Sequence, residues 1–287
     1  MNVGEKIGKF QVISTLGTGA HSTILHVRRA ADGKQYALKV VPLDGPEDHK
    51  FLEQARHEFQ VAGMLDSPNC LKAFALEEKR DWLFRVKKAH LLVEYVNGKT
   101  LDKMPVMPCP KLVQIFHKVA QALVHMHRRQ VVHADLKPGN LMLSRAGQVK
   151  VLDFGLAWIK GKPKDRVQGT PEYMAPETAK HKTVNQQTDI FNFGATMYRL
   201  VTFRMIPPTG AALEGMALDS KAWTNRLEPV SKFSAEAPKE LCDLIHHCLA
   251  HKAHDRPERM SDVAAVLEGL SQKLVTSSAD KLEALEW

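Results

Sequence analysis

The sequence predicts an α+β protein in two parts, a small antiparallel sheet with one helix followed by a larger, mainly helical part. In the first third of the chain, short runs rich in β-branched and aromatic residues alternate with turn signals, which is typical of strands. Beyond Asn97-Gly98, apolar residues recur at helical spacing. We therefore expect a first part over residues 1–96, a second over residues 97–270, and a C-terminal tail over residues 271–287 to which the sequence assigns no role.

The first part contains five expected strands and one expected helix. The helix is indicated over residues 47–65, where Phe51, Ala55, Phe59 and Ala62 recur at helical spacing. Asp32-Gly33 is a turn signal between the second and third strands. The strands are expected at residues 10–13, 23–27, 36–41, 71–76 and 89–95.

The second part contains one long amphipathic helix and several shorter ones. The apolar face of the long helix is formed by Leu112, Phe116, Val119, Leu123 and Met126. Further helices are expected over residues 187–201, 237–249 and 261–270.

Composition favours a globular protein in a reducing compartment. Of 287 residues, 44% are hydrophobic and 25% are charged, and no apolar run reaches the roughly 18 to 20 residues of a membrane span. Residues 1–10 do not resemble a secretory signal. The four cysteines are scattered without a Cys-x-x-Cys pair, so we expect reduced thiols and a cytoplasmic location. Whether the chain is part of a longer or membrane-anchored protein is left open.

Two further function classes are weighed and not favoured. The net charge is +8, but we identify no block of lysine and arginine interleaved with aromatic residues, so nucleic acid is not an expected partner. Cysteines and histidines gather near residues 242–254, which is compatible with zinc. A late helix with Cys248 as a small core residue is the favoured interpretation.

The chemistry is indicated by two segments, His133 to Asn140 and Asp153-Phe154-Gly155. Asp135 is suited to accept a proton from an attacking hydroxyl group. Asn140 and Asp153 offer amide and carboxylate oxygens, which are the ligands that Mg²⁺ prefers. These residue types in this order predict phosphoryl transfer.

The order of these motifs resembles that of the eukaryotic-like serine/threonine protein kinases over nearly the whole chain. The resemblance implies the two-lobed kinase fold, ATP and Mg²⁺ as cofactors, and a protein substrate. It implies that Asp135 is the catalytic base, that Lys137 contacts the γ-phosphate, and that Asn140 and Asp153 bind the metal. Lysine two positions after the aspartate is typical of the serine/threonine kinases.

Ala37-Leu38-Lys39 resembles the kinase Val-Ala-Ile-Lys signature on the third strand. The resemblance implies that Lys39 holds the α- and β-phosphates and pairs with Glu58 of the first helix. Gly17-Thr18-Gly19 would let a hairpin approach the phosphates, although Ser22 stands where the third glycine is usual. The implied nucleotide pocket comprises Gly17, Thr18, Gly19, Ser22, Ile24, Ala37, Lys39, Val93 at its back, the hinge residues Glu94 and Val96, and Met142.

The stretch from Gly169 to Glu177 resembles the end of a kinase activation segment, where a substrate peptide docks. The resemblance implies that Thr170 hydrogen-bonds toward Asp135 and Lys137. It also implies that Glu177 pairs with Arg256 and that Asp189 supports the catalytic loop.

Ala134 stands where the resembled family has the arginine of His-Arg-Asp, which receives an activation-loop phosphate. Residues 156–168 contain no Ser, Thr or Tyr. We therefore expect activity that does not require phosphorylation of this loop. The same loop carries Lys160, Lys162, Lys164 and Arg166, for which a solvated surface is the favoured interpretation.

The favoured function is an ATP-dependent serine/threonine protein kinase. One alternative is a pseudokinase. Ser22 and Ala134 favour it, whereas the presence of all the expected catalytic residues (Lys39, Glu58, Asp135, Asn140 and Asp153) disfavours it. Another is a small-molecule kinase, which Pro138-Gly139-Asn140 resembles but the peptide-docking stretch disfavours. The sequence leaves open the physiological substrate, the autophosphorylation sites, the oligomeric state and the source organism.

Overall fold

The computed structural model describes residues 3–19, 21–163, 168–209 and 219–283. The chain forms two compact units. The first unit comprises Met1–Gly98 together with Leu152–Gly155, and the second comprises Lys99–Val151 and Leu156–Trp287. The first is mainly sheet and the second mainly helix, which confirms the predicted α+β class with a small antiparallel sheet and a larger helical part.

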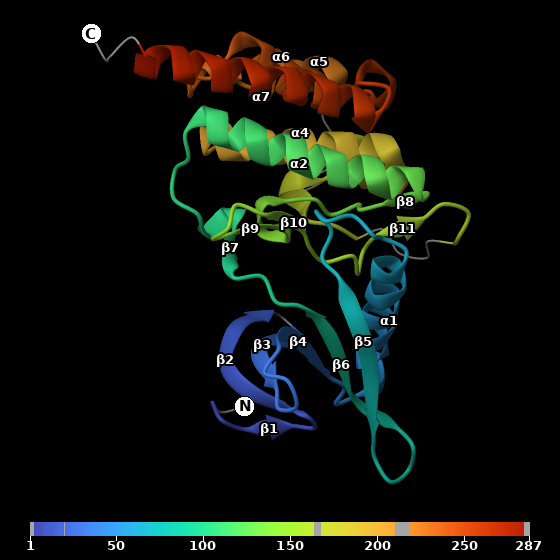
Figure 1. Cartoon of the computed structure of the whole chain (residues 1–287). Coiled ribbons are helices and arrows are strands. Elements are labelled where there is room, and N and C mark those ends of the chain that lie inside the picture. Colours follow the sequence, from blue (N-terminus) through green and yellow to red (C-terminus); the bar gives the residue numbers. More distant parts are fainter. Residues whose placement is uncertain (1–2, 20, 164–167, 210–218, 284–287) are drawn as a thin grey trace. The chain divides into compact units, whose positions relative to one another are not determined.

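The first unit is a six-stranded antiparallel sheet with one α-helix (Figure 1). Its spatial order is β1-β2-β3-β4-β6-β5, so the last two strands form a hairpin at one edge. The five strands and the helix expected from the sequence are present, and β5 and β6 extend toward each other beyond their expected ends. The elements are β1 (Lys6–Ile7), β2 (Phe10–Gly19), β3 (Ser22–Arg29), β4 (Gln35–Pro42), α1 (His49–Gly63), β5 (Ala73–Arg80) and β6 (Val86–Glu94).

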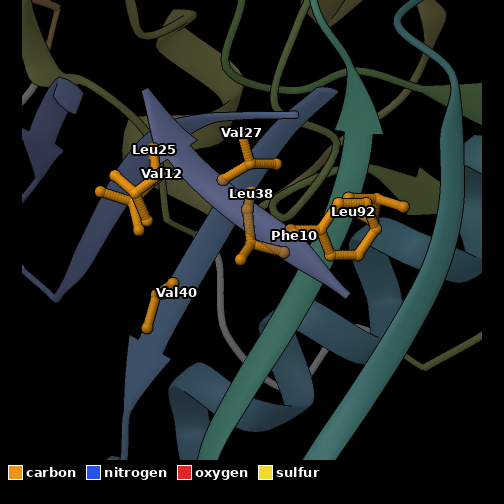
Figure 2. Close-up of a cluster of buried hydrophobic side chains, with 7 residues drawn as sticks. All are labelled: Phe10, Val12, Leu25, Val27, Leu38, Val40 and Leu92. Carbon is orange, nitrogen blue, oxygen red and sulfur yellow. The ribbon is translucent and has the colours of Figure 1, made fainter. Parts of the chain in front are cut away.

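The two faces of this sheet carry different apolar clusters because side chains alternate along each strand. Figure 2 shows the cluster on one face, which consists of Phe10, Val12, Leu25, Val27, Leu38, Val40 and Leu92. On another face Ala37, Leu91 and Val93 pack with Phe59 of α1. Lys39 therefore projects between buried neighbours on the side of the sheet that carries α1.

The second unit is built mainly from six α-helices among its described residues (Figure 1). The long helix α2 packs against α7 and α4, and α4 packs against α6. The three predicted helices after α2 are confirmed, and α7 continues beyond residue 270. The helices are α2 (Cys109–Arg128), α3 (Pro176–His181), α4 (Gln186–Thr202), α5 (Ser220–Arg226), α6 (Lys239–Cys248) and α7 (Met260–Glu283).

Short strands hold the loops that carry the chemistry-bearing residues of the second unit. One sheet has the order β10-β9-β7, and a separate pair joins β11 to β8. The strands are β7 (Gly98–Thr100), β8 (Val131–Val132), β9 (Leu141–Ser144), β10 (Val149–Val151) and β11 (Trp158–Ile159). The stretch from residue 133 to 140 thus lies between β8 and β9. In the described part of the chain, no helix has the length and apolar character needed to cross a membrane.

Candidate active site

In the first unit, Lys39 and Glu58 form a buried ion pair. Lys39 lies on β4 opposite Ile24 and Leu91, and Glu58 lies on the buried face of α1, where its side chain is 7% exposed. Lys39 Nζ is 2.6 Å from Glu58 Oε2. Burial acts to lower the pKa of Lys39, but the charges of Glu58 and Asp153 outweigh it and raise that pKa. The lysine is therefore held as a cation.

Asp153 belongs to the same unit and has a left-handed backbone, with φ of +57°. Its Oδ1 is 3.9 Å from Lys39 Nζ and accepts a hydrogen bond from the Gly155 amide at 3.2 Å. A Cβ on Gly155 would lie 2.7 Å from Cγ of Gln54, so glycine suits this close approach to α1. A non-glycine residue in this conformation is strained, and such strain concentrates at functional sites.

The hairpin between β2 and β3 carries the predicted phosphate-contacting glycines. Gly17 pairs with Ile24, Thr18 with Thr23, and Gly19 with Ser22. No described atom beyond its chain neighbours lies within 4 Å of the Cβ position at Gly17, so the backbone is open to approach there.

The residues predicted to wall the nucleotide pocket come from both units, and each group is described within its own unit. Ile24, Ala37 and Val93 pack in one cluster of the first unit. Glu94 ends β6, and Val96 follows it, half-buried. Met142 lies on β9 of the second unit and is also half-buried.

In the second unit, Asp135 is the centre of a hydrogen-bond network. The backbone amide and the hydroxyl group of Thr170 both donate to Asp135 Oδ1 at 2.8 Å. Lys137 Nζ donates to Thr170 Oγ1 at 2.6 Å and lies 3.2 Å from Asp135 Oδ2. Asn140 Nδ2 donates to the backbone carbonyl of Asp135 at 2.8 Å. The contacts expected between Thr170, Asp135 and Lys137 are present.

The orientation of Asn140 matters for metal binding. Because its amide nitrogen donates to Asp135, its amide oxygen is the acceptor atom that this side chain retains for a metal ion. The side chain of Asp153 is 43% exposed. Carboxylate and amide oxygens are the ligand types that Mg²⁺ prefers, so each of these residues offers a suitable ligand atom in its own unit.

Asp189 of α4 supports the backbone of the loop that follows β8, as the resemblance implies. It is fully buried and accepts hydrogen bonds from the amides of Ala134 at 2.8 Å and His133 at 2.9 Å. His127 Nε2 lies 2.8 Å from Asp189 Oδ2. Burial acts to raise the pKa of Asp189, but these hydrogen bonds and the neighbouring histidines outweigh it and lower that pKa. The aspartate therefore stays ionised.

The predicted pair of Glu177 and Arg256 is also present. Arg256 Nη1 and Nη2 each donate to one oxygen of the Glu177 carboxylate at 2.8 Å, so the pair is bidentate. The Arg256 side chain is 0% exposed. This pair ties α3, which contains Glu177, to the loop before α7.

Ala134 contributes to an apolar cluster that sequence reasoning missed. It is 5% exposed, has a φ of +67°, and packs with Val132 and Val184. Trp158 of β11 packs against the same cluster. The absence of the usual arginine can be read from the sequence. The apolar cluster cannot, because it is formed by residues that are distant in the sequence.

Two other sequence interpretations concern the activation loop and the Cys/His-rich segment. Lys160 and Lys162 of the loop are described, whereas residues 164–167, with Lys164 and Arg166, lie outside the described residues. The described residues contain no group of three or more His, Cys, Asp or Glu side chains placed to hold a metal ion. Cys248 is buried, and burial raises the pKa of its thiol to about 12.

Comparison with known proteins places this fold and these motifs in one class. The family model described as protein kinase domain matches residues 10–267. Serine/threonine-protein kinase PrkC of Bacillus subtilis is 27% identical over 92% of this chain and 41% of its own length. The Streptomyces coelicolor protein SCO3848, named a probable serine/threonine-protein kinase, is 32% identical over 91% of this chain and 40% of its own.

The chain therefore belongs to the protein kinase family. It is also similar to a protein of Bifidobacterium longum named a probable serine/threonine-protein kinase PknB, at 29% identity over 88% of the chain and 38% of that protein. The chain thus spans about two fifths of the length of these relatives. Protein kinases as a family use ATP and Mg²⁺.

Proposed function

We propose that this chain is an active serine/threonine protein kinase that transfers the γ-phosphoryl group of Mg-ATP to a serine or threonine hydroxyl. The observation that carries the proposal is the network around Asp135. Its carboxylate already accepts hydrogen bonds from a hydroxyl group, that of Thr170, and lies beside the ammonium group of Lys137. Such a carboxylate can orient a substrate hydroxyl group and accept its proton.

Each remaining candidate residue is assigned a separate task. Lys39, held as a cation by Glu58, binds the α- and β-phosphates. Lys137 offsets charge that develops on the transferred group, and Thr170 keeps Lys137 and Asp135 in register. Asn140 and Asp153 would hold Mg²⁺, which would supply positive charge to offset that of the phosphates. The adenine and the phosphates are assigned to Gly17, Thr18, Gly19, Ser22, Ile24, Ala37, Val93, Glu94, Val96 and Met142.

The experiment is transfer of labelled γ-phosphate from Mg-ATP to a generic basic protein. Wild type is compared with Asp135→Asn and Asp153→Asn, and the labelled amino acids are identified. We expect phosphoserine or phosphothreonine with wild type and a loss of at least about a hundredfold in each variant. Tight nucleotide binding without transfer would replace the proposal with a pseudokinase. Transfer to small molecules alone would replace it with a small-molecule kinase.

We further propose that this activity does not depend on a phosphate on the activation loop. A phosphate acts through a cationic receptor, and at position 134 the side chain is an alanine packed among Val132, Val184 and Trp158. The cluster offers apolar contacts to this part of the loop through β11 instead. Phosphatase-treated protein should therefore retain its initial rate. A rate that falls on dephosphorylation and returns with a phosphate on the activation segment contradicts this proposal.

A further inference from the structure

The β5–β6 hairpin ends in an exposed apolar tip. Trp82 is 84% exposed, Leu83 is 45% exposed and Phe84 is 80% exposed. Figure 1 shows this closed end extending past the other strands of its unit. Three consecutive large apolar side chains on a surface are unusual in a soluble protein and indicate an interaction site.

The tip is a defined turn. Asp81 Oδ1 accepts hydrogen bonds from the amides of Leu83 at 2.8 Å and Arg85 at 3.0 Å, and the Phe84 amide donates to the Asp81 carbonyl at 3.0 Å. The Asp81 amide donates to the Arg85 carbonyl at 2.9 Å, which closes the loop. The three apolar side chains are therefore presented together at the apex.

Phe84 occupies a backbone position that does not favour it. Its φ is +60°, in the left-handed region that a turn of this kind normally fills with glycine or asparagine. A bulky residue there costs conformational energy. Because the side chain is 80% exposed, packing within the protein offers little to offset that cost. The aromatic ring at this point is better explained by contact with something outside the chain.

Cations surround the tip. Residues 77–88 contain five lysines or arginines against three acids, and this corrects the expectation that no basic stretch interleaves with aromatic residues. All five cations are exposed. Within the described part of the chain, Lys87 and Lys88 form no ion pair, whereas the others pair as Lys79–Glu77, Arg80–Glu78 and Arg85–Asp81.

We propose that this hairpin tip docks onto an anionic lipid bilayer, with Trp82, Leu83 and Phe84 entering the headgroup region and the cations facing the lipid phosphates. Tryptophan is favoured at the membrane–water interface, and each lysine or arginine near an anionic leaflet strengthens binding about fivefold. A convex tip of three side chains suits a bilayer, which needs no matching pocket. A stable protein interface needs roughly 1,000 Å² of complementary surface.

The test measures binding of the full chain to vesicles of phosphatidylcholine, alone or mixed with phosphatidylglycerol. We expect binding to the anionic vesicles that weakens with added salt, and quenching of Trp82 fluorescence by brominated lipid. Trp82→Ser combined with Phe84→Ser should weaken binding by at least about tenfold. Replacing Lys87 and Lys88 with glutamine should weaken vesicle binding by more than about tenfold. The same substitution at the exposed control pair Lys111 and Lys252 should leave vesicle binding unchanged.

A glycine variant separates lipid contact from folding. Phe84→Gly removes the strain, so it should raise the thermal midpoint while it weakens vesicle binding. The matched control is Phe203→Gly, because Phe203 is also exposed, at 49%, and has a φ of +58°. This control should relieve strain without a change in binding. Phosphate transfer to a soluble substrate should be unchanged in both variants, so the result is independent of the proposed kinase activity.

Three outcomes overturn the proposal. They are no binding of wild type to anionic vesicles, equal binding by the Trp82/Phe84 variant, and binding to a protein partner that requires Trp82 while vesicles are ignored. The last would assign the tip to protein docking.

Discussion

The bidentate pair of Glu177 and Arg256 should be among the most costly polar contacts to break in the second unit. Arg256 donates five hydrogen bonds, two to Glu177 and three to the backbone carbonyls of Gln187, Ala250 and His251. Its side chain is 0% exposed, so water cannot replace a lost partner. The guanidinium group also lies over the ring of Phe191, 4.8 Å from the centroid.

The expected cost follows from these contacts. Glu177→Ala leaves a buried cation without its counter-charge, which lowers the free energy of unfolding by about 3–5 kcal/mol. At about 2–4 °C per kcal/mol, the thermal midpoint falls by roughly 6–20 °C. Glu177→Gln keeps one acceptor oxygen but loses the charge. Because charge-assisted hydrogen bonds are about twice as strong as neutral ones, Glu177→Gln should lower the free energy of unfolding by about half as much as Glu177→Ala does.

Urea unfolding of wild type, Glu177→Ala, Glu177→Gln and Arg256→Met provides the measurement. Arg256→Met should be the most destabilised, since it also leaves three backbone carbonyls without their donor. The control is Asp243→Ala, which removes the exposed partner of Lys239 and should behave like wild type. If Glu177→Ala unfolds within about 1 kcal/mol of wild type, the pair does not hold α3 in place and the reasoning fails.

Three further predictions concern neighbouring parts of the second unit. Gly194→Ala would place a Cβ 2.8 Å from Cβ of buried Cys248, so it should lower stability by about 1–3 kcal/mol in urea unfolding; an unchanged midpoint would show that α4 and α6 separate easily. The pKa of Asp189 lies below its ordinary value of 3.8, so its stabilisation is present at neutral pH and is lost as the pH falls below that value. Asp189→Asn should therefore be less stable at neutral pH, and its free energy of unfolding should fall less steeply than that of wild type as the pH is lowered. An equally steep fall would assign acid unfolding to other carboxylates. Ala134→Arg inserts a cation into the cluster with Trp158, so calorimetry should show a lower midpoint and kinetics no new dependence on phosphorylation; a more active variant would argue that the apolar cluster has no role.

Much of the fold and the candidate site follows from local sequence patterns. The strands β2 to β4 and the helices α1 and α2 combine regular apolar spacing with clear turn signals, so these local patterns identified them. The contacts of Thr170 with Asp135, and of Glu177 with Arg256, were predicted because the motifs that contain them resemble those of the protein kinases. Their side chains are distant in sequence and meet only in the folded second unit.

What the sequence did not reveal depends on non-local packing or on exceptions to propensity. The apolar cluster around Ala134 needs Trp158, which the β8–β11 pairing brings alongside. The second half of β5, from Glu77 to Arg80, is polar and mostly exposed, so it lacks the alternation of a half-buried strand. Phe84 occupies a left-handed position where turn statistics predict glycine, and no local rule places an aromatic ring there.

The proposed function requires that the chain catalyses phosphate transfer without a phosphate on its activation loop. The most direct measurement is the time course of phosphate transfer from Mg-ATP to a soluble protein substrate, started with fully dephosphorylated enzyme and run beside Asp153→Asn. With wild type, we expect transfer to serine or threonine that is linear from the first time point, and with the variant we expect none. A lag that shortens as the enzyme phosphorylates itself, or transfer that persists in Asp153→Asn, would contradict it.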